Sequence, residues 1–406
     1  ELQSYFMKRI EKFLNENNRT LIGWDEILEG GLPEEATVMS WRGFKGGWEA
    51  SAAGHDVIMT PTSHLYFDYY QGSPDHEPVA FNAFTPLERV YEFRPVLDSM
   101  SVEQKKHVLG GQANLWAEYV PTEEHSEYML FPRLAALAEV VWSPEEQLDW
   151  EDFSVRIRRM MERFEVMGIN YAKSAYAIQP ESDIDLETGE ITIKLKSEFP
   201  NTEIRYALNE EELTAESSVY ESEIKVDTDT KIKAAVFSNS KVMGPVMDKT
   251  FQFHKAVAKP VTYKYPFNKS YASTGETALV NVLKGSKYFK DGRWQGWIGN
   301  PAIVTIDLEE TTTVNEVVVG SLEEQGTGIY FPQHLKVEVS KDGKTFEEVA
   351  SLERDYQTNP GAKIENFELK FETQENIQFV RVSIEPLAKT PNGGGAWLFL
   401  DEIQVK

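Results

Sequence analysis

The residues that decide the fold are 107–119, HVLGGQANLWAEY, where a short apolar run ends in an indole and a carboxylate. Three more short apolar runs lie nearer the N-terminus, namely LIGW (21–24), TVMSW (37–41) and DVIMT (56–60). Each run is short and rich in aliphatic residues, which is typical of a buried strand. Helical stretches lie between and after the runs. Strands that alternate with helices indicate βα units, so we expect residues 1–172 to fold around a parallel sheet.

Four stretches of this segment have the periodicity of amphipathic helices. The first is the opening stretch ELQSYFMKRIEKFLNENN, in which aromatic and aliphatic residues recur at helical spacing. The other three are expected near residues 86–97, 128–142 and 153–167. Charged side chains within these stretches are interpreted as structural ion-pair partners; they are Arg89, Arg133 and Glu139.

An aromatic residue and a charged residue follow each predicted strand. The pairs are Trp24 with Glu26, Trp41 with Arg42, Tyr66 with Asp68, and Trp116 with Glu118. In a parallel barrel the carboxyl ends of the strands form the active face. Indoles can cover the apolar face of a pyranose and carboxylates accept hydrogen bonds from its hydroxyls, so the pattern favours a sugar site. The alternative for each tryptophan is core or rim packing. Asp25 is interpreted as a solvated or capping residue.

Five motifs in this order resemble those of glycoside hydrolase family 20 β-N-acetylhexosaminidases. They are GWDEI (23–27), VMSWRG (38–43), YFDYYQ (66–71), VLGGQANLWAEY (108–119) and PRLAALAEVVW (132–142). The resemblance implies a TIM-type (β/α)8 barrel. It also implies that Trp24, Trp41 and Trp116 line a pocket around the sugar and its N-acetyl group. Tyr66 would hydrogen-bond the acetamido oxygen, while Asp68 and Glu118 would hold the hydroxyls at carbons 4 and 6.

The resemblance further implies a retaining mechanism in which the substrate assists its own hydrolysis. The acetamido oxygen attacks the anomeric carbon, while an Asp–Glu pair, usually within His-x-Gly-Gly-Asp-Glu, orients the acetamide and protonates the leaving oxygen. That motif is absent, and neither Asp25–Glu26 nor Asp401–Glu402 matches it. A complete barrel has eight strands and about 250 residues, whereas residues 1–172 show four strand runs. We therefore expect this chain to hold the second, C-terminal half of the barrel, with the general acid upstream.

Alternating strands dominate the rest of the chain, which indicates two all-β sandwich domains. Residues 175–254 are predicted to form a small antiparallel β-sandwich like those that follow the barrel in bacterial hexosaminidases. KAVAKP (255–260) is predicted to be a linker. Residues 258–406 resemble discoidin-like (F5/8-type C) carbohydrate-binding modules through FKDGRWQGWIG (289–299) and LFLDEIQV (398–405). Such modules often hold a structural Ca²⁺, and the resemblance implies Asp291 and Glu402 as ligands, although both types are also common turn and edge residues.

The composition narrows the classes of partner. The formal net charge of -25, without a basic stripe, argues against nucleic acid. No apolar run reaches the roughly 18 residues that a membrane span requires. The chain has no cysteine, which excludes disulfides, Cys–zinc sites and thiol catalysis, and its 7 histidines show no metal-binding spacing. We expect no cofactor for catalysis.

The sequence thus favours an exo-acting glycosidase that removes terminal β-linked N-acetylglucosamine or N-acetylgalactosamine from glycans or glycoconjugates. The alternative is a non-catalytic glycan-binding protein. The choice between the two sugars and the oligomeric state stay open. The accompanying β-sandwich and discoidin-like domains imply an extracytoplasmic protein (periplasmic, cell-surface or secreted) whose signal region lies outside this chain.

Overall fold

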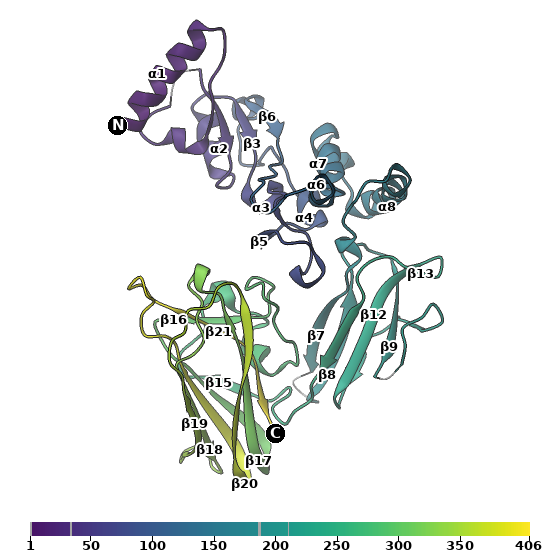
Figure 1. Ribbon diagram of the computed structural model, residues 1–406, viewed down its shortest axis with the longest axis vertical. Coiled ribbons are helices and arrows are strands. Elements are labelled where there is room, and N and C mark those ends of the chain that lie inside the picture. Colours follow the sequence, from purple (N-terminus) through teal and green to yellow (C-terminus); the bar gives the residue numbers. More distant parts are fainter. Residues whose placement is uncertain (1, 33–34, 186–187, 210) are drawn as a thin grey trace. The chain divides into compact units, whose positions relative to one another are not determined.

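A computed structural model describes residues 2–32, 35–185, 188–209 and 211–406 (Figure 1). The chain divides into two compact units. The first unit comprises Glu1–Ala177 and Ser197–Thr202, and the second comprises Ile178–Lys196 and Glu203–Lys406. The predicted division into domains at 1–172, 175–254 and 258–406 is a different one and stays a prediction. Within the described ranges, no helix is both long and apolar enough to cross a membrane.

The first unit is built on a parallel sheet of four strands in the order β1-β2-β3-β6. The strands are β1 Ile22–Trp24, β2 Thr37–Ser40, β3 Val57–Met59 and β6 Val108–Gly111. All four predicted strand runs are therefore confirmed, each trimmed at its ends. Helix α2 (Lys45–Ala52) lies closely against β3, because Gly47 has no Cβ to collide with the Met59 thioether.

The helices agree with the periodicity at the two ends of the first unit. They are α1 Leu2–Glu16 and α8 Trp150–Met167. The expected helix at 128–142 is instead two helices, α6 Glu123–Leu130 and α7 Arg133–Trp142. Pro132 stands between them, and proline cannot donate the hydrogen bond that a continuous helix needs.

The expected helix at 86–97 is also wrong in length. It is α4, which covers only Leu87–Tyr91. Pro95 follows soon after, and the residue before a proline is disfavoured from helical backbone. The chain therefore leaves the helix several residues earlier than its apolar spacing indicated.

Two antiparallel sheets make up residues 179–251. One has the order β11-β8-β7, and the other has the order β10-β9-β12-β13 with β14 also paired to β12. The strands are β7 Gln179–Asp185, β8 Glu190–Lys196, β9 Glu203–Leu208, β10 Ser218–Val219, β11 Ile224–Val226, β12 Thr230–Ser238, β13 Lys241–Val242 and β14 Met247–Phe251. Alternate residues of β8 are buried, which is the pattern of a sheet with one face on a core.

The segment between β8 and β9 belongs to the first unit. It is Ser197–Thr202, and its Phe199 ring lies 4.7 Å from Tyr176 and 6.3 Å from Trp150. Phe199 is 1% exposed, so this short segment is part of the apolar core of the first unit.

The last part of the chain is an antiparallel β-structure of long strands in the order β16-β21-β17-β20-β18-β19, with β15 paired to β17. The strands are β15 Val261–Tyr263, β16 Gln295–Ile298, β17 Ala302–Glu323, β18 His334–Ser340, β19 Glu347–Glu353, β20 Lys363–Glu385 and β21 Trp397–Val405. β17 and β20 run side by side along its length (Figure 1).

The expected linker KAVAKP is wrong. Ala256 is 0% exposed and Val257 is 4% exposed, and both belong to the buried interior. The Lys255 N–H donates to the Val405 carbonyl at 2.9 Å, and the Ala258 N–H donates to the Val280 carbonyl at 3.0 Å. The small apolar side chains of this segment suit packing, so it opens the last β-structure instead of leading up to it.

Candidate functional site

The four aromatic residues predicted to line a pocket all lie where the parallel strands end. Trp24 is the last residue of β1, and Trp41 directly follows β2. Tyr66 follows α3 (Thr62–Leu65), the short helix after β3, and Trp116 lies in the loop after β6. Ligands of parallel α/β folds bind beyond the carboxyl ends of the strands. The topology therefore places all four side chains on the functional edge of the sheet.

Their rings form one cluster. The ring centroids of Trp24 and Trp116 are 5.9 Å apart, and those of Trp41 and Tyr66 are 6.4 Å apart. Burial raises the pKa of the Tyr66 phenol and the Trp116 indole opposes this rise, so the two pairs are neighbours. Trp24 and Trp41 are half-buried, whereas Trp116 is 42% exposed. The cluster thus has an accessible apolar surface on a buried base.

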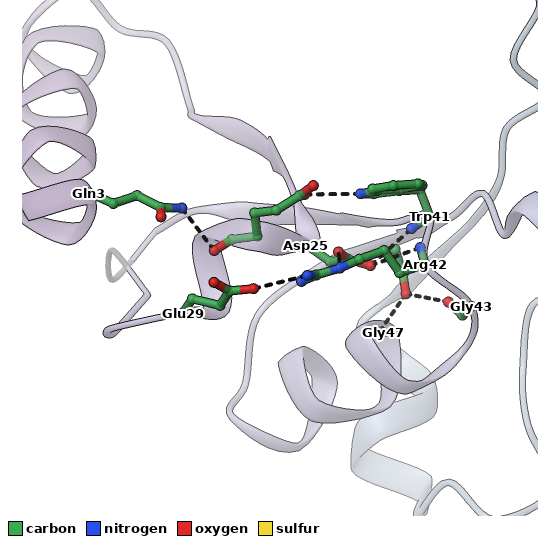
Figure 2. Close-up of polar contacts among 9 residues, drawn as sticks. Gln3, Asp25, Glu29, Trp41, Arg42, Gly43 and Gly47 are labelled. Atoms are coloured by element: carbon green, nitrogen blue, oxygen red, sulfur yellow. Dashed lines mark hydrogen bonds and ion pairs between the residues drawn. The ribbon is translucent and has the colours of Figure 1, made fainter. Parts of the chain in front are cut away.

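Asp25 holds the loop that carries Trp41. Its carboxylate accepts hydrogen bonds from the main-chain N–H groups of Trp41 and Arg42 at 3.1 and 3.2 Å, and it pairs with the Arg42 guanidinium at 2.5 Å. Figure 2 shows Asp25 between these groups. Asp25 is 2% exposed, so its interpretation as a solvated residue is wrong. Beside it, Glu26 accepts a hydrogen bond from the Trp41 indole at 2.9 Å, which fixes the direction of the ring.

Asn114 joins the loops of Tyr66 and Trp116, a role that no sequence pattern indicated. Its main chain pairs with both neighbours of Tyr66, since the Asn114 N–H donates to Leu65 and the Asn114 carbonyl accepts from Phe67. Its side chain donates to the Thr60 hydroxyl at 2.5 Å. Asn114 is 7% exposed. These bonds set the relative position of two of the aromatic residues.

Asp68 is a buried carboxyl close to the cluster. It is 6% exposed, and its Oδ1 has no hydrogen-bond partner within the described residues. Burial raises the pKa of Asp68 to about 6, and the charge of Glu118 adds to this, while main-chain hydrogen bonds and the Arg133 cation oppose it. Glu118 itself is exposed. The two predicted hydroxyl-binding carboxylates are therefore close enough to interact, and one of them has an acceptor oxygen that is free for a ligand.

Burial also raises the pKa of the Tyr66 hydroxyl above its ordinary value, against a lowering contribution from Trp116. The phenol therefore stays protonated at neutral pH and can donate a hydrogen bond. Aromatic surfaces, one phenol donor and two carboxylate acceptors are the groups that a protein uses to bind an amide-bearing sugar.

Residues 1–145 match the family model described as the catalytic domain of glycosyl hydrolase family 20. This part of the chain is therefore similar to that family. Two more models match farther along the chain, the chitobiase/β-hexosaminidase C-terminal domain at residues 187–248 and the F5/8 type C domain at residues 266–403. The three resemblances inferred from the sequence are thereby confirmed.

Curated proteins similar to this chain are named β-hexosaminidases. That of Porphyromonas gingivalis is 43% identical over 250 residues, which are 61% of this chain and 32% of the relative. That of Vibrio furnissii is 34% identical over 141 residues, which are 34% of this chain and 23% of the relative. The chain therefore spans about a third or less of the length of these relatives.

A solved structure is also similar to part of this chain. It is a GH20 exo-β-N-acetylglucosaminidase from Vibrio harveyi in complex with N-acetylglucosamine, 28% identical with a TM-score of 0.40. The match covers 42% of this chain and 27% of the other.

The F5/8 type C resemblance implied Asp291 and Glu402 as Ca²⁺ ligands, and this assignment stays a prediction; in the structure both carboxylates accept hydrogen bonds from the protein. The Asp291 carboxylate accepts the main-chain N–H groups of Ser286 and Arg293 at 2.5 and 2.9 Å. Glu402 is 1% exposed, with Oε1 2.8 Å from His254 Nε2 and further N–H donors from Asn281 and Val282. In the part of the chain that the structure describes, no group of three or more candidate side chains could hold a metal.

The three charged side chains that were predicted to form ion pairs in the helices have two kinds of partner. Arg89 pairs with Glu92 at 3.1 Å, and Glu139 pairs with Arg156 through two hydrogen bonds, so both are ion-pair partners as expected. Arg133 differs, because its hydrogen bonds all go to main-chain carbonyls.

Proposed function

We propose that the protein containing this chain is an exo-β-N-acetylhexosaminidase that removes terminal β-linked N-acetylglucosamine or N-acetylgalactosamine. The aromatic cluster of Trp24, Trp41, Tyr66 and Trp116 next to the buried Asp68 carries this proposal. The names of the relatives and the family 20 match support it.

The cluster suits the N-acetyl side of such a sugar. The methyl of an acetamido group needs apolar walls, which the three indoles provide. Its carbonyl oxygen needs a donor, and the Tyr66 phenol is protonated because burial raises its pKa. We assign Tyr66 the task of holding the acetamido oxygen in position for attack on the anomeric carbon.

Asp68 and Glu118 are assigned to the hydroxyls at carbons 4 and 6. The Asp68 carboxyl has a pKa of about 6, so it is mostly ionised at neutral pH and accepts hydrogen bonds. A charge-assisted hydrogen bond to a hydroxyl is roughly twice as strong as a neutral one. These contacts would hold the terminal sugar and would leave no room for substitution at its far end, as an exo-acting enzyme requires.

Hydrolysis is proposed to be substrate-assisted and retaining. The acetamido oxygen attacks the anomeric carbon as the bond to the leaving oxygen breaks, a carboxylic acid protonates that oxygen, and water then opens the oxazolinium ion. Neither Asp–Glu dipeptide of this chain suits the catalytic pair, because Asp25 is paired with Arg42 and so is not free to orient the acetamide, and Glu402 is 1% exposed and so cannot reach a leaving oxygen. We therefore place the catalytic Asp–Glu pair upstream, on a part of the protein outside these 406 residues.

On this proposal, the parallel sheet is the second half of a (β/α)8 barrel. Both of its edge strands carry exposed apolar side chains, Ile22 in β1 at 53% and Leu109 in β6 at 60%. Soluble proteins usually cover or charge such edges. The other four strands would cover them and complete the pocket.

The glycan partners and the location follow from the same proposal. A carbohydrate-binding role for the F5/8 type C domain would keep the enzyme on glycans or glycoconjugates with terminal N-acetylhexosamine. Such substrates, together with the bacterial relatives, support an extracytoplasmic location.

The test is to offer the full-length protein an aryl β-N-acetylglucosaminide and the matched aryl β-glucoside. We expect release from the first alone, because only it carries the attacking acetamide. Equal release from both would contradict the assignment of the cluster. Binding of N-acetylglucosamine without release from either substrate would favour a non-catalytic glycan-binding protein. The 406-residue chain by itself is expected to bind the sugar without turnover.

A further inference from the structure

Arg133 lies at the start of α7 and is 0% exposed. Its guanidinium donates hydrogen bonds to four main-chain carbonyls. The distances are 2.6 Å to Phe67, 3.0 Å to Tyr69, 2.9 Å to Thr85, and 3.2 and 2.5 Å to Met129. A buried charge is costly, and a protein that needed only to fill this space could use an apolar side chain. The placement of these carbonyls indicates what the charge does.

Two of the four carbonyls flank Asp68. Because the guanidinium is a planar fork, one cation holds the peptide group that precedes Asp68 and the peptide group that follows Tyr69. The ring of Phe67 adds a third contact, with the guanidinium carbon 4.7 Å from its centroid. The direction in which Asp68 leaves the main chain is therefore set by Arg133.

Arg133 also acts on the charge of Asp68. Burial and Glu118 both raise the pKa of the Asp68 carboxyl, and the cation lowers it. The phenols of Tyr66 and Tyr69 are the other titratable groups beside Asp68. Burial lowers the pKa of Arg133 to about 9, so the cation persists at neutral pH.

We propose that Arg133 is a positioning residue for sugar binding, whose guanidinium holds the main chain around Asp68 and so aims that carboxylate at the hydroxyls of the terminal sugar. This inference rests on the proposed function. It adds a residue on a helix, outside the aromatic cluster, to the machinery of recognition.

The experiment compares Arg133→Lys and Arg133→Gln in the full-length protein, with the pH dependence of kcat/KM for an aryl β-N-acetylglucosaminide as readout. Lysine keeps the positive charge but loses the planar guanidinium, so it cannot hold both carbonyls. We expect KM to rise about tenfold or more, since small misplacements cost up to about 10²-fold. The low-pH side of the kcat/KM profile (the acid limb) should keep its midpoint. Glutamine loses the charge as well, so the acid limb should also move to higher pH.

Arg94 offers the matched control. It likewise donates to two main-chain carbonyls, those of Tyr91 and Phe93 at 2.8 and 2.9 Å, but neither flanks a residue of the cluster. Arg94→Lys and Arg94→Gln should lower thermal stability and leave both KM and the acid limb unchanged.

A purely structural Arg133 predicts another result, in which both variants lose folded protein while the folded fraction keeps the KM and acid limb of the unaltered enzyme. That result would overturn the inference. If Arg133→Gln does not fold, the KM of Arg133→Lys is the test, and a KM equal to that of the unaltered enzyme would overturn the inference. Absence of turnover by the unaltered protein would overturn the proposed function and this inference together.

Discussion

The indole rings of Trp24 and Trp116 lie 5.9 Å apart, although β1 and β6 are the two outer strands of the four-stranded sheet. Adjacent strands are about 4.8 Å apart, so a flat sheet would separate its outer strands by roughly 14 Å. The contact therefore requires the loop after β6, which carries Trp116, to reach back across the carboxyl edge of the sheet toward β1. This loop brings residues that are 92 positions apart in the sequence into contact.

Trp116→Ala should weaken binding of N-acetylglucosamine by about three- to tenfold, the range expected for loss of one aromatic contact. Because Trp116 is 42% exposed, the free energy of unfolding should change by no more than about 0.5 kcal/mol. Calorimetric titration of the sugar measures the first quantity, and denaturant unfolding measures the second. Trp142→Ala, which removes an indole that is 88% exposed on α7, should leave binding unchanged. Equal weakening by both variants would remove Trp116 from the site.

Tyr66→Phe and Glu118→Gln should separate the two steps of the reaction. The first removes a donor that acts on the attacking acetamide, so kcat should fall on the order of 10²-fold while KM changes little. The second weakens a charge-assisted bond to a hydroxyl, costing about 1.5–3 kcal/mol, and should raise KM. Steady-state kinetics of the full-length protein provide both values. A Tyr66→Phe variant with an altered KM and an intact kcat would contradict the assigned role.

Ionisation of Asp68 as the pH rises should lower the stability of the fold and strengthen sugar binding. Burial raises the pKa of its carboxyl to about 6, from 3.8, so the folded protein holds this proton more tightly than the unfolded chain. The contribution of Asp68 to stability therefore falls as the pH rises through this window, while sugar binding strengthens as the carboxylate forms. Asp68→Asn should be more stable than the unaltered protein at about pH 7 and equal to it below about pH 4. Urea unfolding at both pH values checks this, and a variant less stable at neutral pH would refute it.

The last β-structure should need its leading residues. A fragment of residues 253–406 retains His254, which contacts Glu402, and the buried Ala256, whereas a fragment of residues 259–406 loses both. The shorter fragment leaves Glu402 buried without that partner, so its unfolding free energy should be lower by about 3 kcal/mol or more. Thermal and denaturant unfolding of the two fragments give the comparison. Equal stability would show that the segment merely rests on the surface.

The sequence allowed prediction of the strands and of the aromatic cluster for a local reason. A short apolar run marks a strand, and the residues just beyond it lie at the functional edge whatever the rest of the chain does. Trp24, Trp41, Tyr66 and Trp116 could therefore be placed together without knowledge of their neighbours. The lengths of α4 and α7 were less accessible, because the apolar spacing continues across Pro95 and Pro132 whereas the helical backbone does not.

The supporting residues could not be predicted, because their partners lie far along the chain. Asp25 binds the main chain 16 positions away, Asn114 reaches Thr60 across 54 positions, and Arg133 reaches Phe67 across 66. No periodicity records such pairs. A charged or amide side chain in a loop or helix looks the same in the sequence whether it is solvated or holds a distant carbonyl.

The membership of Ser197–Thr202 in the first unit bears on how such proteins can be recombined. Family models place the boundary of the second module before this segment, yet Phe199 packs on Tyr176 and Trp150, and Glu198 accepts the main-chain N–H of Glu88. In a chimaera joined at residue 178, Glu198 and Phe199 would come from one parent, and the residues that they contact in the first unit would come from the other. When modules are exchanged between relatives, this six-residue segment and the residues that it contacts in the first unit therefore have to come from the same parent.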